Sequence, residues 1–437
     1  MDSEWAAAAR LVRRTGFGAS GRTVDAVLRE GGAAYVRRIV AADPTADAGA
    51  RRTPPPRFPA VASPRPGGGM SAAQKKQRNA ARHDESVQLT GWWLRRMLAV
   101  EQPFGEKATF VWHSHFATSL KKVKIASLML QHNERQRGLA TSRFDTLAYT
   151  MLLDAATQRW LDNVRNTVTG PNENLSREFM EVFTLGHADG YTEHDVRDGA
   201  RALTGYKVDP HDGTVSLRPA LHDTGAKTVF GHTGDFDAKG FCDAVLARPG
   251  CARYVVARLF GRLVSDRAAD DATQDRLLAA YGPRRDLAEL LVAMFTDHAF
   301  DDARDTFVVG PVEWLIGAMR ALGVTADSDA ELRQTTATLD ALGQLPFFPP
   351  SVGGWPSGAV WLSTAAADLR FRAAGRLVQH ADLDDLTGSP TARVEAIAYR
   401  LGIATWSDRT LAVLRGTAGD VRQLAAVALN SPEYLVH

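Results

Sequence analysis

The sequence predicts a mostly α fold: a single large multi-helical domain with a small β-hairpin excursion near residues 207–235. Two observations support this prediction. Apolar residues recur at helical spacing over most of the 437-residue chain. Gly, Asp, Thr and Val alternate between residues 207 and 240, a texture typical of short strands and turns. We therefore expect helices to build the core and strands to interrupt it once.

The composition is that of an ordinary globular protein. Hydrophobic residues make up 45% of the chain and charged residues 23%, which excludes a disordered or fibrous protein. The formal net charge of +2 gives no electrostatic case for a nucleic-acid partner. The length suits one large domain, so we expect residues 1–437 to form one helical domain.

The sequence as written carries no evident targeting signal. No apolar run reaches 18 residues, so we expect no membrane span. Residues 1–5 lack the basic and apolar regions of a signal peptide. These observations predict a cytoplasmic protein, or an exported one if a leader was removed or is supplied otherwise.

The first half of the chain reads as helices separated by one irregular segment. Helices are expected over about residues 5–45, where Ser20 or Thr23 can cap one of them. Seven prolines, followed by three consecutive glycines, predict an extended, mobile loop over residues 44–72. Helical periodicity resumes near residue 72 and continues to about 206.

The second half begins with the β excursion. Residues 213–217 and 227–231 read as strands of one or two hairpins. Helices return over 240–325, and Pro311 begins one of them in the position that proline prefers. Residues 343–362 hold too much Pro and Gly for regular structure. Two or three helices finish the chain, and we expect residues 366–437 to pack on the core.

The chain has two cysteines, Cys242 and Cys251. Their spacing excludes a C-x-x-C redox or zinc motif. We expect two reduced, partly buried thiols, and the alternative is a local disulfide that closes a ten-residue loop.

The most informative polar segment is a helix expected between Pro171 and Gly186. Glu178 and Glu181 are three residues apart, so they project from neighbouring turns of one helix face. Two such carboxylates can hold a metal or divide the work of general acid and base. The alternative is a solvated face whose spacing supports an ion pair between Glu173 and Arg177.

Three histidines lie in the helical part upstream of this segment. His113 and His115 are two residues apart on an expected helix, so their side chains point about 200° away from each other. They cannot both bind one metal there, and we expect one to face a site and the other to be packed. His132 carries the same ambiguity, because a single buried histidine is usually a hydrogen-bonded core residue.

The β excursion adds a His-Asp pair in a glycine-bearing loop. His222 and Asp223 are adjacent, and a carboxylate commonly orients a histidine in a site. Lys227 can bind an anionic group. The alternative is an Asx-turn in which Asp223 accepts a hydrogen bond from nearby backbone.

Several motifs together resemble one protein family. They occur in the expected order at residues 14–18, 112–116, 129–132, 161–163, 171–178, 184–186, 190–193, 202–205, 222–228 and 353–356. On these motifs the chain resembles the uncharacterised bacterial family DUF1800. The resemblance implies a family core over about residues 10–365 and export from the cell, but no reaction. Because the shared motifs are rich in polar residues, the resemblance favours a functional site among them.

We expect an enzyme with a Glu/His site in a helical cleft. The favoured reaction is hydrolysis of a glycan or similar polar substrate by Glu general acid/base chemistry. The expected catalytic residues are Glu178, Glu181, His222 and Asp223. The expected substrate-binding residues are His113, His115, His132, Asn172, Glu173, Asn174, Arg177, Lys227, Trp112 and Trp355.

Two alternatives stay open at this point. The first is a metal-dependent oxidoreductase with iron or manganese, whose divalent metal would be bound by Glu178, Glu181 and His113, His115 or His222. The second is a non-enzymatic scaffold or binding protein, in which the polar signature residues form a buried network. The expected partner is a small molecule or glycan, and the sequence does not define an oligomeric state.

Overall fold

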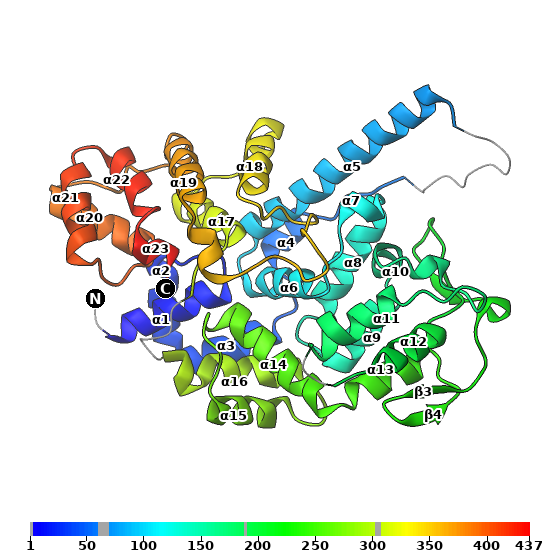
Figure 1. The fold of residues 1–437 in the computed structure, drawn as a ribbon. Helices are drawn as coiled ribbons and strands as arrows, with labels where there is room; N and C mark the ends of the chain where they lie inside the picture. The colour runs from blue at the N-terminus through cyan, green and yellow to red at the C-terminus, as the bar shows by residue number, and fades with distance from the viewer. Residues whose placement is uncertain (1–2, 60–69, 188–189, 302–306) are drawn as a thin grey trace.

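The computed structural model describes residues 3–59, 70–187, 190–301 and 307–437 (Figure 1). Helices form most of this part of the chain, and its two sheets are small antiparallel hairpins. The prediction of a mostly α fold with a small β excursion is therefore confirmed. Across these ranges, no helix is both long and apolar enough to cross a membrane.

The first third of the chain is helical wherever it forms regular structure. Its elements are α1 Ser3–Thr15, α2 Gly21–Glu30, α3 Gly32–Ala41, α4 Ala48–Arg52, α5 Ala72–Ala99, α6 Phe104–His115, α7 Leu120–Val123, α8 Ala126–Leu139, α9 Phe144–Leu152 and α10 Ala155–Trp160. Ser20 caps α2 as predicted, because its side chain accepts a hydrogen bond from the Thr23 N–H. The short helix α4 was not expected within the loop 44–72, and residues 60–69 of that loop lie outside the described residues.

The middle of the chain holds the acidic helix and the β excursion. Its elements are η1 Asn163–Arg165, α11 Asn174–Glu178, the π-helical turn η2 Phe179–Thr184, α12 Glu193–Ala202, β1 Tyr206–Val208, β2 Val215–Leu217, η3 Pro219–Leu221, β3 Lys227–Val229 and β4 His232–Gly234. Strand β1 pairs with β2 in one hairpin, and β3 pairs with β4 in the other. The single regular helix expected here instead changes from α to π geometry at Phe179.

The remainder of the chain returns to helices. Its elements are α13 Ala238–Leu246, α14 Pro249–Leu263, α15 Asp271–Tyr281, α16 Leu287–Thr296, η4 His298–Asp301, α17 Pro311–Leu322, α18 Asp329–Ala341, η5 Gly358–Leu362, α19 Thr364–Leu377, α20 Pro390–Arg400, α21 Asp408–Thr417, α22 Val421–Ala428 and α23 Pro432–Leu435. Pro311 begins α17 as predicted, and Cys242 and Cys251 are buried thiols. Two expectations were wrong: η5 lies within 343–362, and more than three helices follow residue 362.

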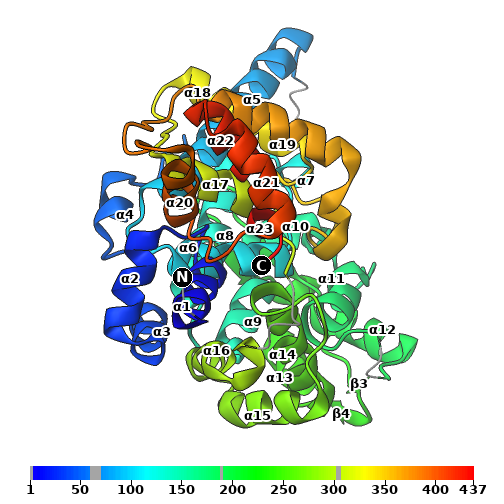
Figure 2. The ribbon, with the colours of Figure 1, turned by 90° about the vertical axis from the view of Figure 1, so that its left-hand side faces the viewer.

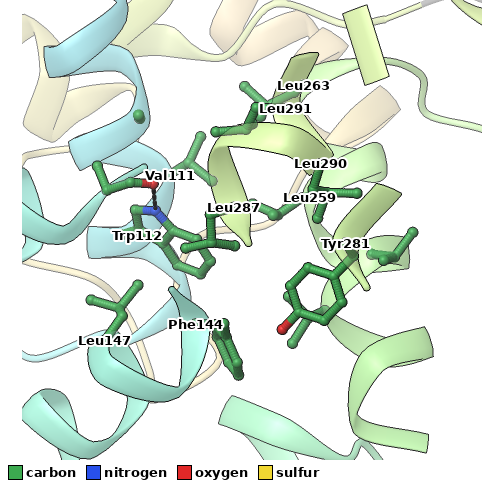
Figure 3. Close-up of a cluster of buried hydrophobic side chains, with 14 of the residues drawn as sticks. Val111, Trp112, Phe144, Leu147, Leu259, Leu263, Tyr281, Leu287, Leu290 and Leu291 are labelled. Carbon is green, nitrogen blue, oxygen red and sulfur yellow. Dashed lines mark hydrogen bonds between the residues drawn. The ribbon is translucent and has the colours of Figure 1, made fainter. Parts of the chain in front are cut away.

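Two hydrophobic clusters fill the interior, and α6 contributes to both. The first joins side chains of α6 and α9 to those of α14, α15 and α16, with Leu287 next to Trp112 and Leu290 beside Leu259 (Figure 3). The second joins α5 and α8 to α17, α19 and the C-terminal helices (Figure 2). Phe110 of α6 belongs to this second cluster. α6 therefore lies where the two apolar interiors meet.

The loop at residues 353–356 packs directly on the C-terminal end of α6. A Cβ atom at Gly354 would lie 2.0 Å from the carbonyl oxygen of Ser114, and Gly354 has φ +78°. The Ser114 hydroxyl accepts a hydrogen bond from the Trp355 N–H at 3.4 Å. Only glycine fits a position that combines this close backbone approach with a left-handed conformation.

We predict that Gly354→Ala lowers the free energy of unfolding by more than about 2 kcal/mol, because the methyl group would push the loop away from α6. The matched control is Gly353→Ala, whose Cβ would come no closer than 3.6 Å to the Ser351 hydroxyl. The control should change the free energy of unfolding by less than about 1 kcal/mol. Urea denaturation measures both, and equal losses would contradict this account of the contact.

Candidate functional site

The two histidines at the end of α6 bind the backbone of two distant segments. His113 Nε2 accepts a hydrogen bond from the Phe347 N–H at 3.0 Å, so its imidazole proton lies on Nδ1. His115 Nε2 donates to the Phe183 carbonyl at 2.8 Å, so its proton lies on Nε2. Both side chains are buried, and they point in different directions, as expected for residues two apart on a helix.

Burial also determines the charge of these two histidines. Burial, with nearby Arg258 adding to it, lowers the pKa of His115 to about 3. Burial, with His132 adding to it, holds the pKa of His113 well below its ordinary value. Both imidazoles are therefore neutral at physiological pH, which matches their hydrogen bonds to neutral backbone groups.

His132 forms a buried pair with Asp154, a residue that sequence reasoning missed. Its Nδ1 lies 2.8 Å from Asp154 Oδ1, and Arg135 binds the other carboxylate oxygen at 2.6 Å. Asp154 Oδ1 also accepts the Ala156 N–H at the start of α10. Burial raises the pKa of Asp154, but His132 and Arg135 outweigh burial and the net shift is downward. The pair fixes α8 against α10.

A second buried carboxylate, Glu106 of α6, was also missed. It accepts hydrogen bonds from Arg96, from Arg137 and from the Trp93 indole, the last at 2.8 Å. Burial raises the pKa of Glu106, but the two guanidinium groups outweigh burial and lower it to about 2. The sequence contains no specific signal for Glu106, because its partners Arg96 and Arg137 lie on α5 and α8.

The His-Asp loop is held by contacts with α12 and the residues that follow it, and by a turn of its own. His222 Nδ1 donates to the Thr204 carbonyl at 2.9 Å. Asp223 binds Arg201 and accepts the Gly225 N–H at 2.8 Å, which confirms the Asx-turn. The buried ammonium of Lys227 donates to the Gly225 carbonyl and pairs with Asp235.

The segment before the acidic pair is organised by side-chain to backbone hydrogen bonds. Asn172 accepts the Asn174 N–H at 3.0 Å. Arg177 pairs with Glu173, as its spacing predicts, and also with Glu193 of α12.

The two tryptophans expected to bind substrate are core residues. Trp112 and Trp355 are each 1% exposed, so their indole faces lie in the interior.

Glu178 and Glu181 stand on either side of the change from α to π geometry. The Leu185 N–H donates to the Met180 carbonyl at 2.7 Å, an i to i+5 hydrogen bond that defines the wider turn. The Thr184 hydroxyl donates to the Phe179 carbonyl at 2.5 Å, which satisfies a backbone group that the turn frees. Both carboxylate side chains are half-buried.

The two carboxylates have different surroundings. Glu181 accepts a hydrogen bond from the Tyr191 hydroxyl at 3.0 Å, and His187 Nδ1 lies 3.0 Å from its other oxygen. Glu178 forms no hydrogen bond or ion pair with the described residues. Burial, with the charge of Glu181 adding to it, raises the pKa of Glu178 above its ordinary value. In the acidic pair, Glu181 is therefore held by polar partners, whereas Glu178 has none among the described residues.

The hydrogen bonds and ion pairs of the expected site residues thus fall into separate groups. Glu178 and Glu181 lie together with Tyr191 and His187, which the sequence did not single out. In the part of the chain that the structure describes, no hydrogen bond or ion pair joins these carboxylates to His113, His115, His132 or His222. No group of three or more His, Cys, Asp or Glu side chains among the described residues is arranged to hold a metal ion.

The fold and this arrangement define a mostly helical protein with an acidic pair at a π-helical turn. A comparison with protein-family models matches residues 10–436 to the family described as "Protein of unknown function (DUF1800)". The chain belongs to this family. No curated protein and no solved structure matches the chain.

We predict that Glu106→Gln lowers the free energy of unfolding by about 3–5 kcal/mol at pH 7, because it leaves the buried Arg96 and Arg137 charges uncompensated. A carboxylate with a lowered pKa stabilises the fold fully above its ordinary pKa of 4.5, and the stabilisation fades as pH falls toward 2. The difference between wild type and variant should therefore stay constant from pH 7 down to the ordinary pKa of 4.5 and shrink below it as pH falls toward about 2. Exposed Glu101→Gln is the control, with an expected change of about 0.5 kcal/mol or less.

Proposed function

We propose that the protein is a hydrolase that acts on a glycan or a similar polar substrate, with Glu178 as general acid and Glu181 as general base. The observation that carries the proposal is the contrast between two neighbouring carboxylates at one π-helical turn. Such turns occur frequently at functional sites. Two carboxyl groups whose surroundings separate their protonation states are the usual equipment for acid/base hydrolysis.

Each carboxylate has surroundings suited to one role. Glu178 accepts no hydrogen bond from the residues that the structure describes, and its raised pKa favours a carboxylic acid that can give a proton to the leaving oxygen. Glu181 is oriented by Tyr191 and His187, so its lone pairs are held in place to accept a proton from water. The proton that Glu178 loses and the proton that Glu181 gains balance over one hydrolytic cycle.

A non-enzymatic scaffold is the second candidate, and a specific observation favours it. His113, His115 and His132 each use a ring nitrogen to bind a backbone group or a buried carboxylate. Much of the polar signature is thus occupied in holding segments together. Under this alternative, the acidic pair would also serve the fold.

The test compares Glu178→Gln and Glu181→Gln with wild type. We predict that the wild type releases reducing ends from at least one member of a panel of neutral and acidic glycans, and that each variant lowers kcat at least about 100-fold. Glu395→Gln, an exposed carboxylate on α20, is the matched control and should retain full activity. Because Glu178 has no hydrogen bond to lose, Glu178→Gln should change the free energy of unfolding by no more than about 0.5 kcal/mol at pH 7.

A different pattern would support the scaffold. If both variants lowered the unfolding temperature by several degrees and the wild type hydrolysed no glycan in the panel, the acidic pair would be part of a structural network. Retained hydrolysis in both variants would also overturn the assigned roles.

A further inference from the structure

A cationic groove is lined by residues of helix α5, the short helix α7 and neighbouring segments, and by neither residue of the acidic pair. Figure 1 shows α7 beside the base of the projecting helix α5. Its cavity has a volume of about 330 Å³, within the range of ligand pockets. The lining holds no Asp or Glu, and it consists of Asn79, Arg82, His83, Ser86, Leu120, Lys121, Lys124, Ala126 and Phe348.

The cations of this groove lack counter-charges. Arg82, Lys121 and Lys124 form no ion pair with any carboxylate in the described parts of the chain. Their neighbour Lys122 shows the contrast, because it pairs with Asp162 at 2.6 Å. Glu85 lies one helical turn from Arg82 but outside ion-pair distance. The groove therefore has positive charge that the protein itself does not neutralise.

Two further arginines, Arg78 and Arg159, lie close enough to Arg82 to interact with its charge. Burial, with the charge of Arg78 adding to it, lowers the pKa of Arg82. Burial, with Arg82 adding to it, also lowers the pKa of Arg159 at the end of α10. The Nε atom of Arg159 is buried without a hydrogen-bond partner. Like charges held together in this way cost free energy, which a bound anion would return.

The positive charge continues outward along α5. Lys75, Arg78 and Arg82 are spaced by three and four residues, so they share one face of the helix. They extend over about 10 Å of helix axis. This part of α5 stands away from the body of the protein, as both ribbon views show (Figures 1 and 2). A chain with regularly repeated negative charges fits such a track better than a single small ion does.

We propose that the cationic groove and the α5 track bind an acidic polysaccharide through its carboxylates. Nucleic-acid bases stack on aromatic side chains interleaved with the cations, and residues 72–82 of the α5 track contain no aromatic side chain. The lining of the groove adds only the Phe348 ring and the His83 imidazole. Hydroxyl and amide groups of Ser86 and Asn79 suit a hydroxyl-rich sugar chain. The proposal does not depend on the hydrolase activity, because it concerns binding at a different place.

The test is fluorescence anisotropy with labelled polygalacturonate oligomers and the full chain. The combined substitution Arg82→Gln, Lys121→Gln and Lys124→Gln should raise the Kd at least about tenfold and flatten the dependence of log Kd on log salt. The matched control is Arg29→Gln, Arg37→Gln and Arg409→Gln, three exposed arginines outside the groove without ion pairs to described residues. The control should change the Kd less than about twofold.

Several outcomes would overturn the proposal. Binding of neutral dextran by the wild type as tightly as polygalacturonate would show that charge has no role. Equal losses in both triple variants would show a general charge effect. Tighter binding of a single-stranded DNA oligomer of equal charge and length would assign the groove to nucleic acid. Failure to bind any polyanion would show that the groove is not a polyanion site. Circular dichroism establishes that both variants fold.

Discussion

The hydrogen bonds made by buried polar side chains of α6 join parts of the fold that lie far apart in sequence. His113 holds the segment around Phe347, His115 holds the π-helical turn at Phe183, and Glu106 holds arginines of α5 and α8. A buried polar group that loses its partner costs about 1–3 kcal/mol. Because α6 also contributes to both hydrophobic clusters, its polar contacts set how those clusters meet.

Many polar residues of the family motifs serve the fold rather than a site. Residues such as His113, His132 and Asp223 are occupied in specific hydrogen bonds and ion pairs within the fold. The acidic pair differs, since Glu178 is half-buried and has no hydrogen-bond or ion-pair partner among the described residues. The π-helical turn that presents Glu181 is itself held by His115 of α6. The structural histidines and the candidate catalytic carboxylates are therefore connected through one backbone segment, in which the former would position the latter.

Local features of the fold could be predicted from the sequence, and tertiary ones could not. Ser20 and Pro311 mark helix starts correctly, because the preferences at a helix start depend on the neighbouring backbone alone. The divergence of His113 and His115 follows from helical geometry, but the backbone groups they bind lie at least 68 residues away. The π-helical turn depends on such a distant contact as well, so periodicity predicted a regular helix. Convergence of the acidic pair with the histidines on one cleft stays a prediction.

The central claim is that burial at the π-helical turn, with the charge of Glu181 adding to it, raises the pKa of Glu178 above that of an ordinary glutamate. Carbon-13 NMR titration of the glutamate side-chain carboxyl groups tests it most directly, with signals assigned from the Glu178→Gln and Glu181→Gln spectra. The account predicts that Glu178 titrates clearly above the ordinary glutamate pKa of about 4.3. A Glu178 pKa at or below that ordinary value would contradict it.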